Sequence, residues 1–201
     1  MAKIGIFGGT FDPPHLGHVA VAAEAAQQLA LDRLLIIPTG IPPHKALPAD
    51  APGAEDRLAM TRLAFADIPI AEVREDELRR EGISYTYMTL DALRQEMPEE
   101  EFWLIMGADM FLGVEKWRES RRIFAECSVA ALCREKVDDG SALERHAAYL
   151  REHFGATCRV LRHRVYEVSS TAVRGGDPSE DVRLPKAVGA YIRERGLYGV
   201  R

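Results

Sequence analysis

The stretch KIGIFGGTFDPPHLGH, residues 3–18, decides the fold that the sequence predicts. Its first part, residues 3–8, is a short apolar run closed by glycine, which is typical of a buried strand. A loop containing two glycines and two prolines follows, and residues 16–30 form an alanine-rich stretch with apolar positions at helical spacing. The stretch therefore predicts a strand, a tight loop and a helix.

The same alternation continues along the rest of the chain. Further strands are expected at residues 34–37, 68–73, 102–106 and 128–133, with one or two more within 159–168. Helices are expected at 55–66, 85–97, 118–126 and 141–154, with short helices beginning near Ser170 and at Pro185. Alternating strands and helices predict an α/β, doubly wound and mainly parallel sheet, Rossmann-like in type. We expect a single domain over 1–201, with residues 169–201 as a small helical subregion.

Composition excludes several classes of function. The 201 residues carry a net charge of −5, so no overall basic field favours nucleic-acid binding. No segment reaches the roughly 18 consecutive apolar residues of a membrane span. The cysteines, Cys127, Cys133 and Cys158, are odd in number and form no C-x-x-C pair, so we expect reduced thiols in a cytoplasmic protein. The sequence leaves a homo-oligomer open.

The loop after the first strand has the chemistry of a phosphate site. Gly8 and Gly9 remove side chains where the backbone must approach a ligand, and Thr10 adds a hydroxyl donor. The free N–H groups of the following helix face the same region, which favours a phosphate. His15 and His18 are three residues apart and share one helix face, so their imidazoles can donate to phosphoryl oxygens.

Other interpretations of this loop remain. Dinucleotide dehydrogenases also place glycines after a first strand, but residues 5–10 read GIFGGT and lack the G-x-G-x-x-G spacing. A G-x-x-x-x-G-K-[ST] loop is absent as well. Paired histidines can bind zinc, although a third ligand is needed and a helix N-terminus disfavours a cation. They can also simply pack or cap.

The H-x-G-H pattern of residues 15–18 resembles the signature of the nucleotidyltransferase superfamily. The whole stretch GGTFDPPHLGH is similar to that of the bacterial nicotinate-mononucleotide adenylyltransferases. Further segments resemble the same family in the same order, from residue 4 to about 199: PTGIPPHK at 38–45, SYT at 84–86, GAD at 107–109 followed by Trp117, SST-x-x-R at 169–174, and the ending 192–199.

The resemblance implies transfer of AMP from ATP to nicotinate mononucleotide, giving nicotinate adenine dinucleotide and pyrophosphate, with Mg²⁺ accompanying ATP. The acceptor phosphate attacks the α-phosphate in line, so catalysis rests on positioning and charge neutralisation, without a protein nucleophile. His15, His18 and Lys45 are the catalytic residues that it implies, and His18 stabilises charge at the reacting phosphorus. Rival hypotheses are an adenylyl- or cytidylyltransferase that acts on another phosphate acceptor (nicotinamide mononucleotide, pantetheine phosphate or glycerol phosphate) and a non-catalytic nucleotide-binding module.

Two sets of site residues follow from the motifs and the resemblance, and neither includes a metal ligand. The ATP-binding set is Gly8, Gly9, Thr10, His15, His18, Ser169, Ser170, Thr171 and Arg174. The acceptor-binding set is Lys45, Tyr85, Thr86, Asp109, Trp117 and Arg134.

Most of these residues also have a plain structural interpretation. Ser169 or Ser170 can cap a helix that presents Arg174 one turn on, but the arginine can equally be solvated. Lys45 in its proline-stiffened loop can be a surface lysine.

The acceptor-binding set has alternatives of the same kind. Asp109 can accept from ribose hydroxyls or cap a helix, and Trp117 can stack on the pyridine or lie in the core. Tyr85 and Thr86 are expected to open a helix with Ser84 as its N-cap, where free N–H groups suit the nicotinate carboxylate. For Arg134, at a strand end, the resemblance implies a contact with the acceptor phosphate.

Overall fold

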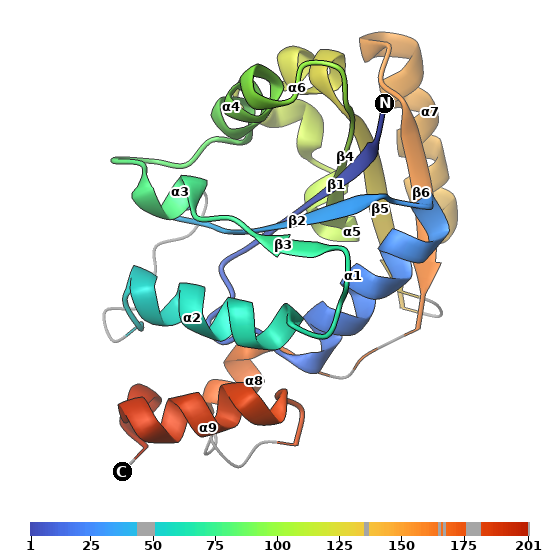
Figure 1. Ribbon diagram of the computed structural model, residues 1–201. Coiled ribbons are helices and arrows are strands. Elements are labelled where there is room, and N and C mark those ends of the chain that lie inside the picture. Colours follow the sequence, from blue (N-terminus) through green and yellow to red (C-terminus); the bar gives the residue numbers. More distant parts are fainter. Residues whose placement is uncertain (44–50, 135–136, 165, 167, 176–181, 201) are drawn as a thin grey trace. The chain divides into compact units, whose positions relative to one another are not determined.

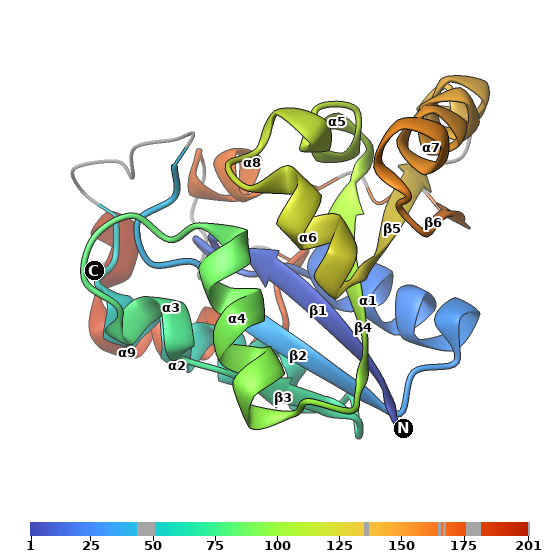
Figure 2. The ribbon, with the colours of Figure 1, turned by 90° about the horizontal axis from the view of Figure 1, so that it is seen from above.

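The protein forms an open six-stranded sheet with helices beside it (Figures 1 and 2). The computed structural model describes residues 1–43, 51–134, 137–164, 166, 168–175 and 182–200. The strands, in the order β3-β2-β1-β4-β5-β6 across the sheet, are β1 Lys3–Gly9, β2 Arg33–Pro38, β3 Ala71–Val73, β4 Glu101–Gly107, β5 Ser128–Arg134 and β6 Cys158–His163. The predicted α/β fold with a parallel sheet is confirmed.

The α-helices are α1 Leu16–Leu29, α2 Ala54–Phe65, α3 Asp76–Arg79, α4 Thr86–Glu96, α5 Ala108–Phe111, α6 Ser120–Glu126, α7 Gly140–Phe154, α8 Ser170–Arg174 and α9 Lys186–Arg195. Two 3₁₀ turns, η1 Val114–Lys116 and η2 Leu197–Gly199, complete the elements of the described residues.

The chain divides into two compact units, each made of three separate segments. The first unit contains Met1–Gly8, Glu24–Leu35 and Tyr85–Val165, and the second contains Gly9–Ala23, Ile36–Ser84 and Tyr166–Arg201. The expectation of a single domain with a helical subregion at 169–201 stays a prediction.

The first unit contains the point where the strand order reverses. Strands β1, β4, β5 and β6 are parallel, with Phe7 opposite Ile105 and Gly107 opposite Leu132. In open α/β sheets, ligands bind beyond the carboxyl ends of the strands at such a reversal, which here lies between β1 and β4. Central residues of β1, β4 and β5 are buried, as their near-continuous apolar runs predict.

Helix α7 shows how local signals fix an element of the first unit. The Asp139 side chain caps it by accepting from the backbone N–H groups of Ser141 and Ala142 at 2.9 and 3.1 Å. At its other end Gly155 takes a left-handed conformation, with φ 67°. Its apolar positions Leu143, Ala147 and Leu150 are buried, and α7 lies along β5 and β6 (Figure 2).

In the second unit the main helix contact joins α2 and α9. Figure 1 shows the two helices side by side, one teal and one red. Met60 and Phe65 of α2 and Val188 and Ile192 of α9 are all buried. At the edge of this contact the hydroxyl of Tyr191 donates to Asp56 at 2.8 Å.

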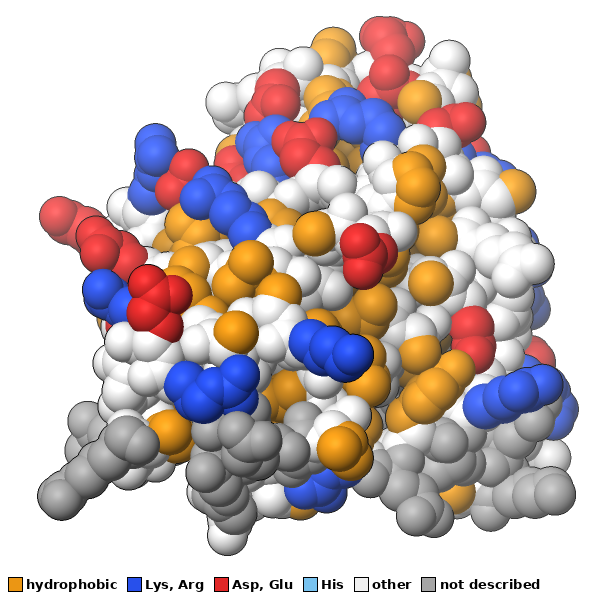
Figure 3. Space-filling view, turned by 60° about the horizontal axis from the view of Figure 1, so that its bottom comes forward, with side chains coloured by type: hydrophobic (Ala, Val, Ile, Leu, Met, Phe, Trp, Pro, Cys, Tyr) orange, Lys and Arg blue, Asp and Glu red, His pale blue; other side chains and the backbone are white. Residues whose placement is uncertain are grey.

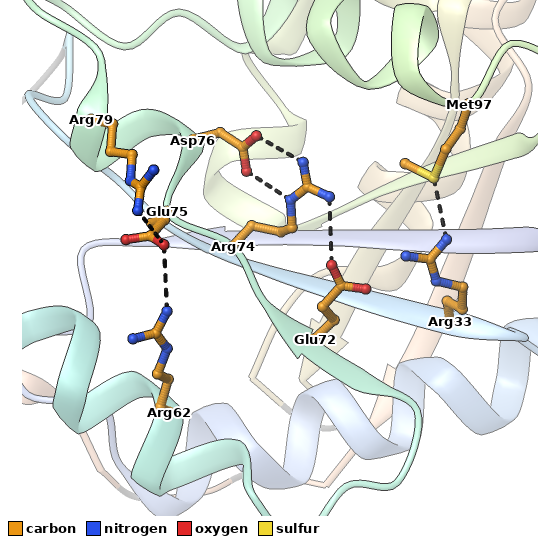
Figure 4. A network of polar contacts seen from close by, with 8 residues as sticks. All are labelled: Arg33, Arg62, Glu72, Arg74, Glu75, Asp76, Arg79 and Met97. Carbon is orange, nitrogen blue, oxygen red and sulfur yellow. Dashed lines mark hydrogen bonds and ion pairs between the residues drawn. The ribbon is translucent and has the colours of Figure 1, made fainter.

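The segment from β3 to α3 is held by ion pairs rather than by an apolar core. Arg74 makes two contacts of 2.9 Å with the carboxylate of Asp76, and Glu75 accepts from Arg79 at 2.9 Å (Figure 4). This hydrogen-bonded pairing lowers the pKa of Asp76.

Several predicted boundaries were wrong for physical reasons. The strand expected at 68–73 is reduced to Ala71–Val73, because Ile68 and Ala71 close turns by donating to Phe65 and Ile68. The helix expected from residue 118 begins at Ser120, since Glu119 adopts a left-handed conformation with φ 59°. Within 159–168 the described residues contain one strand, β6.

The surface and the thiols agree with the composition. On the face drawn in Figure 3, acidic and basic side chains are interspersed with apolar ones. In the described residues no helix is long and apolar enough to cross a membrane. The three cysteines are buried, and burial raises the pKa of Cys127 to about 12 and that of Cys158 to about 11.

Candidate active site

The loop that follows Gly9, the last residue of β1, is folded around an aromatic side chain. Phe11 is only 1% exposed and stands edge-on to the rings of His18 and Phe65, with centroids 5.2 and 5.6 Å apart. A Cβ atom on Gly9 would lie 2.9 Å from the Phe11 ring, so a larger residue would displace that ring. The carbonyl of Gly9 accepts from the backbone N–H of Thr39 at 2.9 Å. The loop is therefore a packed structure of the second unit, not a loose connection.

His15 and His18 form a stacked pair at the start of α1. Their ring centroids are 3.6 Å apart and the ring planes meet at 20°. The backbone N–H of His15 donates to Nδ1 of His18, and the backbone N–H of His18 donates to Nδ1 of His15, both at 3.2 Å. Because both Nδ1 atoms act as acceptors, a neutral ring carries its proton on Nε2. The pair thus presents two Nε2–H donors.

Burial keeps these two rings neutral. Desolvation is the main cause that lowers the pKa of His15 to about 4 and that of His18 to about 3, and for His18 the neighbouring His15 adds to it. At neutral pH both side chains are therefore uncharged hydrogen-bond donors rather than cations. Among the described residues no group of three or more His, Cys, Asp or Glu side chains could hold a metal ion.

The serine-rich segment contacts the same loop within the second unit. Ser169 is the N-cap of α8 and accepts from the backbone N–H of Ala172 at 3.1 Å, which confirms the predicted cap. Ser170 donates to the carbonyl of Pro13 at 2.9 Å. Arg174 donates to the carbonyl of Asp12, and its Nη1 lies 3.4 Å from the Asp12 carboxylate.

These contacts bring the H-x-G-H loop together with the SST-x-x-R segment. Thr171 also belongs to this arrangement, because its Oγ1 accepts from Arg174 at 3.3 Å. The interpretation of Arg174 as a merely solvated arginine is wrong, since its guanidinium is tied to Asp12.

Arg57 is a buried residue of this region that sequence reasoning missed. It is 2% exposed, and its Nη1 donates to the carbonyls of Thr10 at 3.0 Å and Thr39 at 2.7 Å. One buried cation thereby joins the loop after β1 to the loop after β2. An arginine within a predicted helix looks like a surface residue in sequence, so no signal distinguished it.

In the first unit, the N-terminus of α4 differs from the prediction. The N-cap is Tyr85, in an extended conformation, and not Ser84. Ser84 is buried, and its Oγ makes no hydrogen bond within the described residues, so its side chain does not cap the helix. The first N–H groups of α4, those of Thr86 and Tyr87, have no acceptor inside the helix.

Arg118 lies beside this helix start and was not singled out from sequence. Its guanidinium carbon stands 4.9 Å from the centroid of the Tyr85 ring. A hydrogen bond with Tyr85 is the main cause that raises the pKa of Arg118. The start of α4 therefore combines helix N–H groups with a nearby positive charge, which together suit a carboxylate.

The other acceptor residues of the first unit occupy strand ends and a turn. Asp109 lies within α5, just after β4, and the N-cap of α5 is Gly107, so the capping interpretation of Asp109 is wrong. Trp117 is half-buried and ends the turn η1. Arg134 is the last residue of β5 and pairs with Asp138 at 2.8 Å, a hydrogen bond that raises the pKa of Arg134.

Lys45 lies outside the described residues. The ATP-binding set belongs to the second unit except for Gly8, which ends the first unit's opening segment. The described members of the acceptor-binding set all belong to the first unit.

A parallel α/β sheet with a phosphate-type loop and an H-x-G-H histidine pair defines a nucleotidyltransferase. Residues 6–176 match the cytidylyltransferase-like family. A Neisseria meningitidis protein named probable nicotinate-nucleotide adenylyltransferase is 36% identical over 98% of this chain and 99% of its own length. A protein of the same name from Geobacter sulfurreducens is 36% identical over 98% of each chain. The chain belongs to the nicotinate-nucleotide adenylyltransferase family.

Solved structures share the fold. Plasmodium falciparum nicotinic acid mononucleotide adenylyltransferase, complexed with NaAD, matches with a TM-score of 0.77 at 16% identity, covering 100% of this chain and 99% of that one. A Vibrio parahaemolyticus structure described as a putative nicotinate-nucleotide adenylyltransferase matches with a TM-score of 0.63 at 20% identity, over 98% of this chain and 96% of that one.

Proposed function

We propose that the protein transfers AMP from ATP to nicotinate mononucleotide, releasing pyrophosphate and forming nicotinate adenine dinucleotide. The observation that carries the proposal is the His15–His18 pair, whose two Nε2–H donors sit at the start of α1. Free helix N–H groups and neutral imidazole donors are suited to a polyphosphate. The choice of nicotinate mononucleotide as the acceptor rests on the names of the relatives that are 36% identical to this chain.

In the proposed reaction an oxygen of the acceptor phosphate forms a bond to the α-phosphorus of ATP, while the bond from that phosphorus to the bridging oxygen breaks. Pyrophosphate leaves with the electron pair, and no proton need be removed from an ionised phosphate. His18 donates to an α-phosphate oxygen, where charge grows in the transition state. Arg174 and the α8 segment hold the phosphates that leave.

Mg²⁺ is proposed as the companion of ATP. The described residues offer no cluster of three carboxylate, histidine or cysteine ligands. The ion would be held chiefly by phosphate oxygens of ATP and by water, as is common for Mg²⁺ in nucleotide-dependent enzymes. When bound, the ion neutralises part of the triphosphate charge.

For the acceptor, we propose that the start of α4 binds the nicotinate carboxylate. The N–H groups of Thr86 and Tyr87 and the charge of Arg118 favour an acid over an amide. Trp117 stacks on the pyridine ring, Asp109 accepts from ribose hydroxyls, and Arg134 with Lys45 contacts the acceptor phosphate. We propose a cytoplasmic location, because three cysteines with no C-x-x-C pair do not suit a disulfide framework.

The test is the turnover of His18→Ala. Removing a donor that acts in the transition state should lower kcat by roughly two orders of magnitude or more, with a smaller change in the Kd of ATP. The exposed His153 provides the control, and His153→Ala should keep wild-type turnover. Pyrophosphate release by a folded His18→Ala variant at near-normal rate would remove His18 from the mechanism. A wild-type protein that binds ATP but releases no pyrophosphate with any acceptor would be a nucleotide-binding module.

A further inference from the structure

The C-terminal 3₁₀ turn reaches the phosphate loop through one hydrogen bond. The hydroxyl of Tyr198, in η2, donates to Oδ1 of Asp12 at 2.7 Å. Asp12 is 3% exposed, so its carboxylate depends on such partners for the hydrogen bonds that water would otherwise provide. All the residues of this contact belong to the second unit.

The two oxygens of Asp12 have different partners. Oδ1 accepts from Tyr198, while Oδ2 lies 3.4 Å from Nη1 of Arg174. The same Nη1 donates to the backbone carbonyl of Asp12. Tyr198 therefore fixes the rotation of the carboxylate and, with it, the oxygen that faces Arg174.

The backbone on both sides of this bond adopts an unfavourable conformation. Tyr198 has φ 59° and Phe11, which precedes Asp12, has φ 49°, and both lie in the left-handed region that bulky residues avoid. Such conformations persist where surrounding contacts outweigh their cost. Burial and the hydrogen bond to Asp12 raise the pKa of Tyr198, so its hydroxyl stays protonated and remains a donor.

We propose that Tyr198 is a positioning residue for the triphosphate of ATP: through Asp12 it holds Arg174 and the loop that carries His15 and His18 in their binding arrangement. The inference rests on the proposed function of Arg174 as a phosphate contact. Tyr198 itself touches no substrate in this account.

The chain supplies a matched control. The Tyr191 hydroxyl donates to Asp56 at 2.8 Å, also from the C-terminal segment to a carboxylate, but Asp56 lies on α2 and not in the phosphate loop. Tyr198→Phe and Tyr191→Phe each remove one hydroxyl and one hydrogen bond of nearly equal length. A purely structural role predicts similar effects of both substitutions, whereas positioning predicts different effects on ATP.

The experiment measures the Kd of ATP by calorimetry, the inhibition constant of inorganic pyrophosphate, the KM of nicotinate mononucleotide, and Tm for both variants. Tyr198→Phe should raise the Kd of ATP and the inhibition constant of pyrophosphate about tenfold, as expected for a lost hydrogen bond to a charged group. The KM of the acceptor should stay within twofold. Tyr191→Phe should leave all three constants within twofold of wild type.

Asp12→Asn tests the link to Arg174. It keeps an oxygen that can accept from Tyr198 but removes the charge that faces the guanidinium. It should therefore also raise the Kd of ATP and the inhibition constant of pyrophosphate. Equal effects of the two tyrosine variants on ATP, or no effect of Tyr198→Phe, would overturn the proposal. If the wild-type protein transfers no AMP to any acceptor, the proposed function fails instead. The Kd of ATP for Tyr198→Phe still tests the role of Tyr198 in that case.

Discussion

The stacked histidine pair makes the stability of the protein depend on pH over a defined window. Burial lowers the pKa of His15 from 6.5 to about 4 and that of His18 from 6.5 to about 3. Below pH 6.5 the unfolded chain therefore binds protons that the folded protein does not bind. The stabilisation by the neutral rings is complete above pH 6.5 and is lost as the pH falls toward those lowered values.

The magnitude follows from the size of the window. Each pH unit below 6.5 removes about 1.4 kcal/mol per histidine from the free energy of unfolding. Half of the unfolded-state histidines are already protonated at pH 6.5, so between pH 6.5 and pH 5 each ring should remove about 1.6 kcal/mol from the free energy of unfolding, or about 3 kcal/mol for the pair. A change of this size is a large fraction of the stability of an ordinary domain.

Urea unfolding at a series of pH values measures this effect, with wild type compared with the double variant His15→Asn, His18→Asn. The Oδ1 atom of asparagine can replace Nδ1 as the acceptor, but asparagine does not titrate in this range. The double variant should lose about 2–4 kcal/mol less than wild type between pH 6.5 and pH 5. The exposed His153→Asn serves as control and should follow the wild-type curve. Parallel curves for wild type and the double variant would refute the burial argument.

Two further substitutions test single elements. Trp117→Ala should weaken the binding of nicotinate mononucleotide by roughly 1–3 kcal/mol, the range for stacking of a base on an aromatic side chain. The KM of ATP should change little. Equal weakening of both substrates in steady-state kinetics would make Trp117 a structural residue. Asp139→Ala removes the N-cap of α7 and should lower the free energy of unfolding by about 1 kcal/mol in urea titrations. The exposed Glu152→Ala on the same helix should be nearly neutral, and a loss as large as that of Asp139→Ala would contradict a capping role.

Much of the fold could be predicted because long apolar patterns are redundant. Strands such as β4 and β5 and the helix α1 were predicted to within a residue or two, since each has several buried positions in a regular period. Helices α3 and α5, with only four residues each, are too short to show a period. The turn η1 is shorter still.

The motifs predicted that two segments of the second unit lie together, while the roles of their residues stay predictions. Residues 15–18 and 169–174 are recognisable in the sequence by a glycine, paired histidines and an N-capping serine. The contacts of Ser170 and Arg174 bring the second segment to the loop that precedes the first. Arg57 and Tyr198 could not be found in this way, because they act through partners 47 and 186 residues away in sequence. Ser84 was misassigned because a serine before a helix is the expected cap, whereas here it is buried one residue earlier.

The most direct test of the central claim is kcat/KM for nicotinate mononucleotide and for nicotinamide mononucleotide, measured with ATP and Mg²⁺ under identical conditions and with the product mass determined. An amide lacks the charge that the α4 N–H groups and Arg118 favour, and it presents its own donor to those donors. We expect nicotinate adenine dinucleotide and pyrophosphate in equal amounts, and a preference for the acid of at least about a hundredfold. No dinucleotide product, or a ratio within about fivefold, would contradict the account.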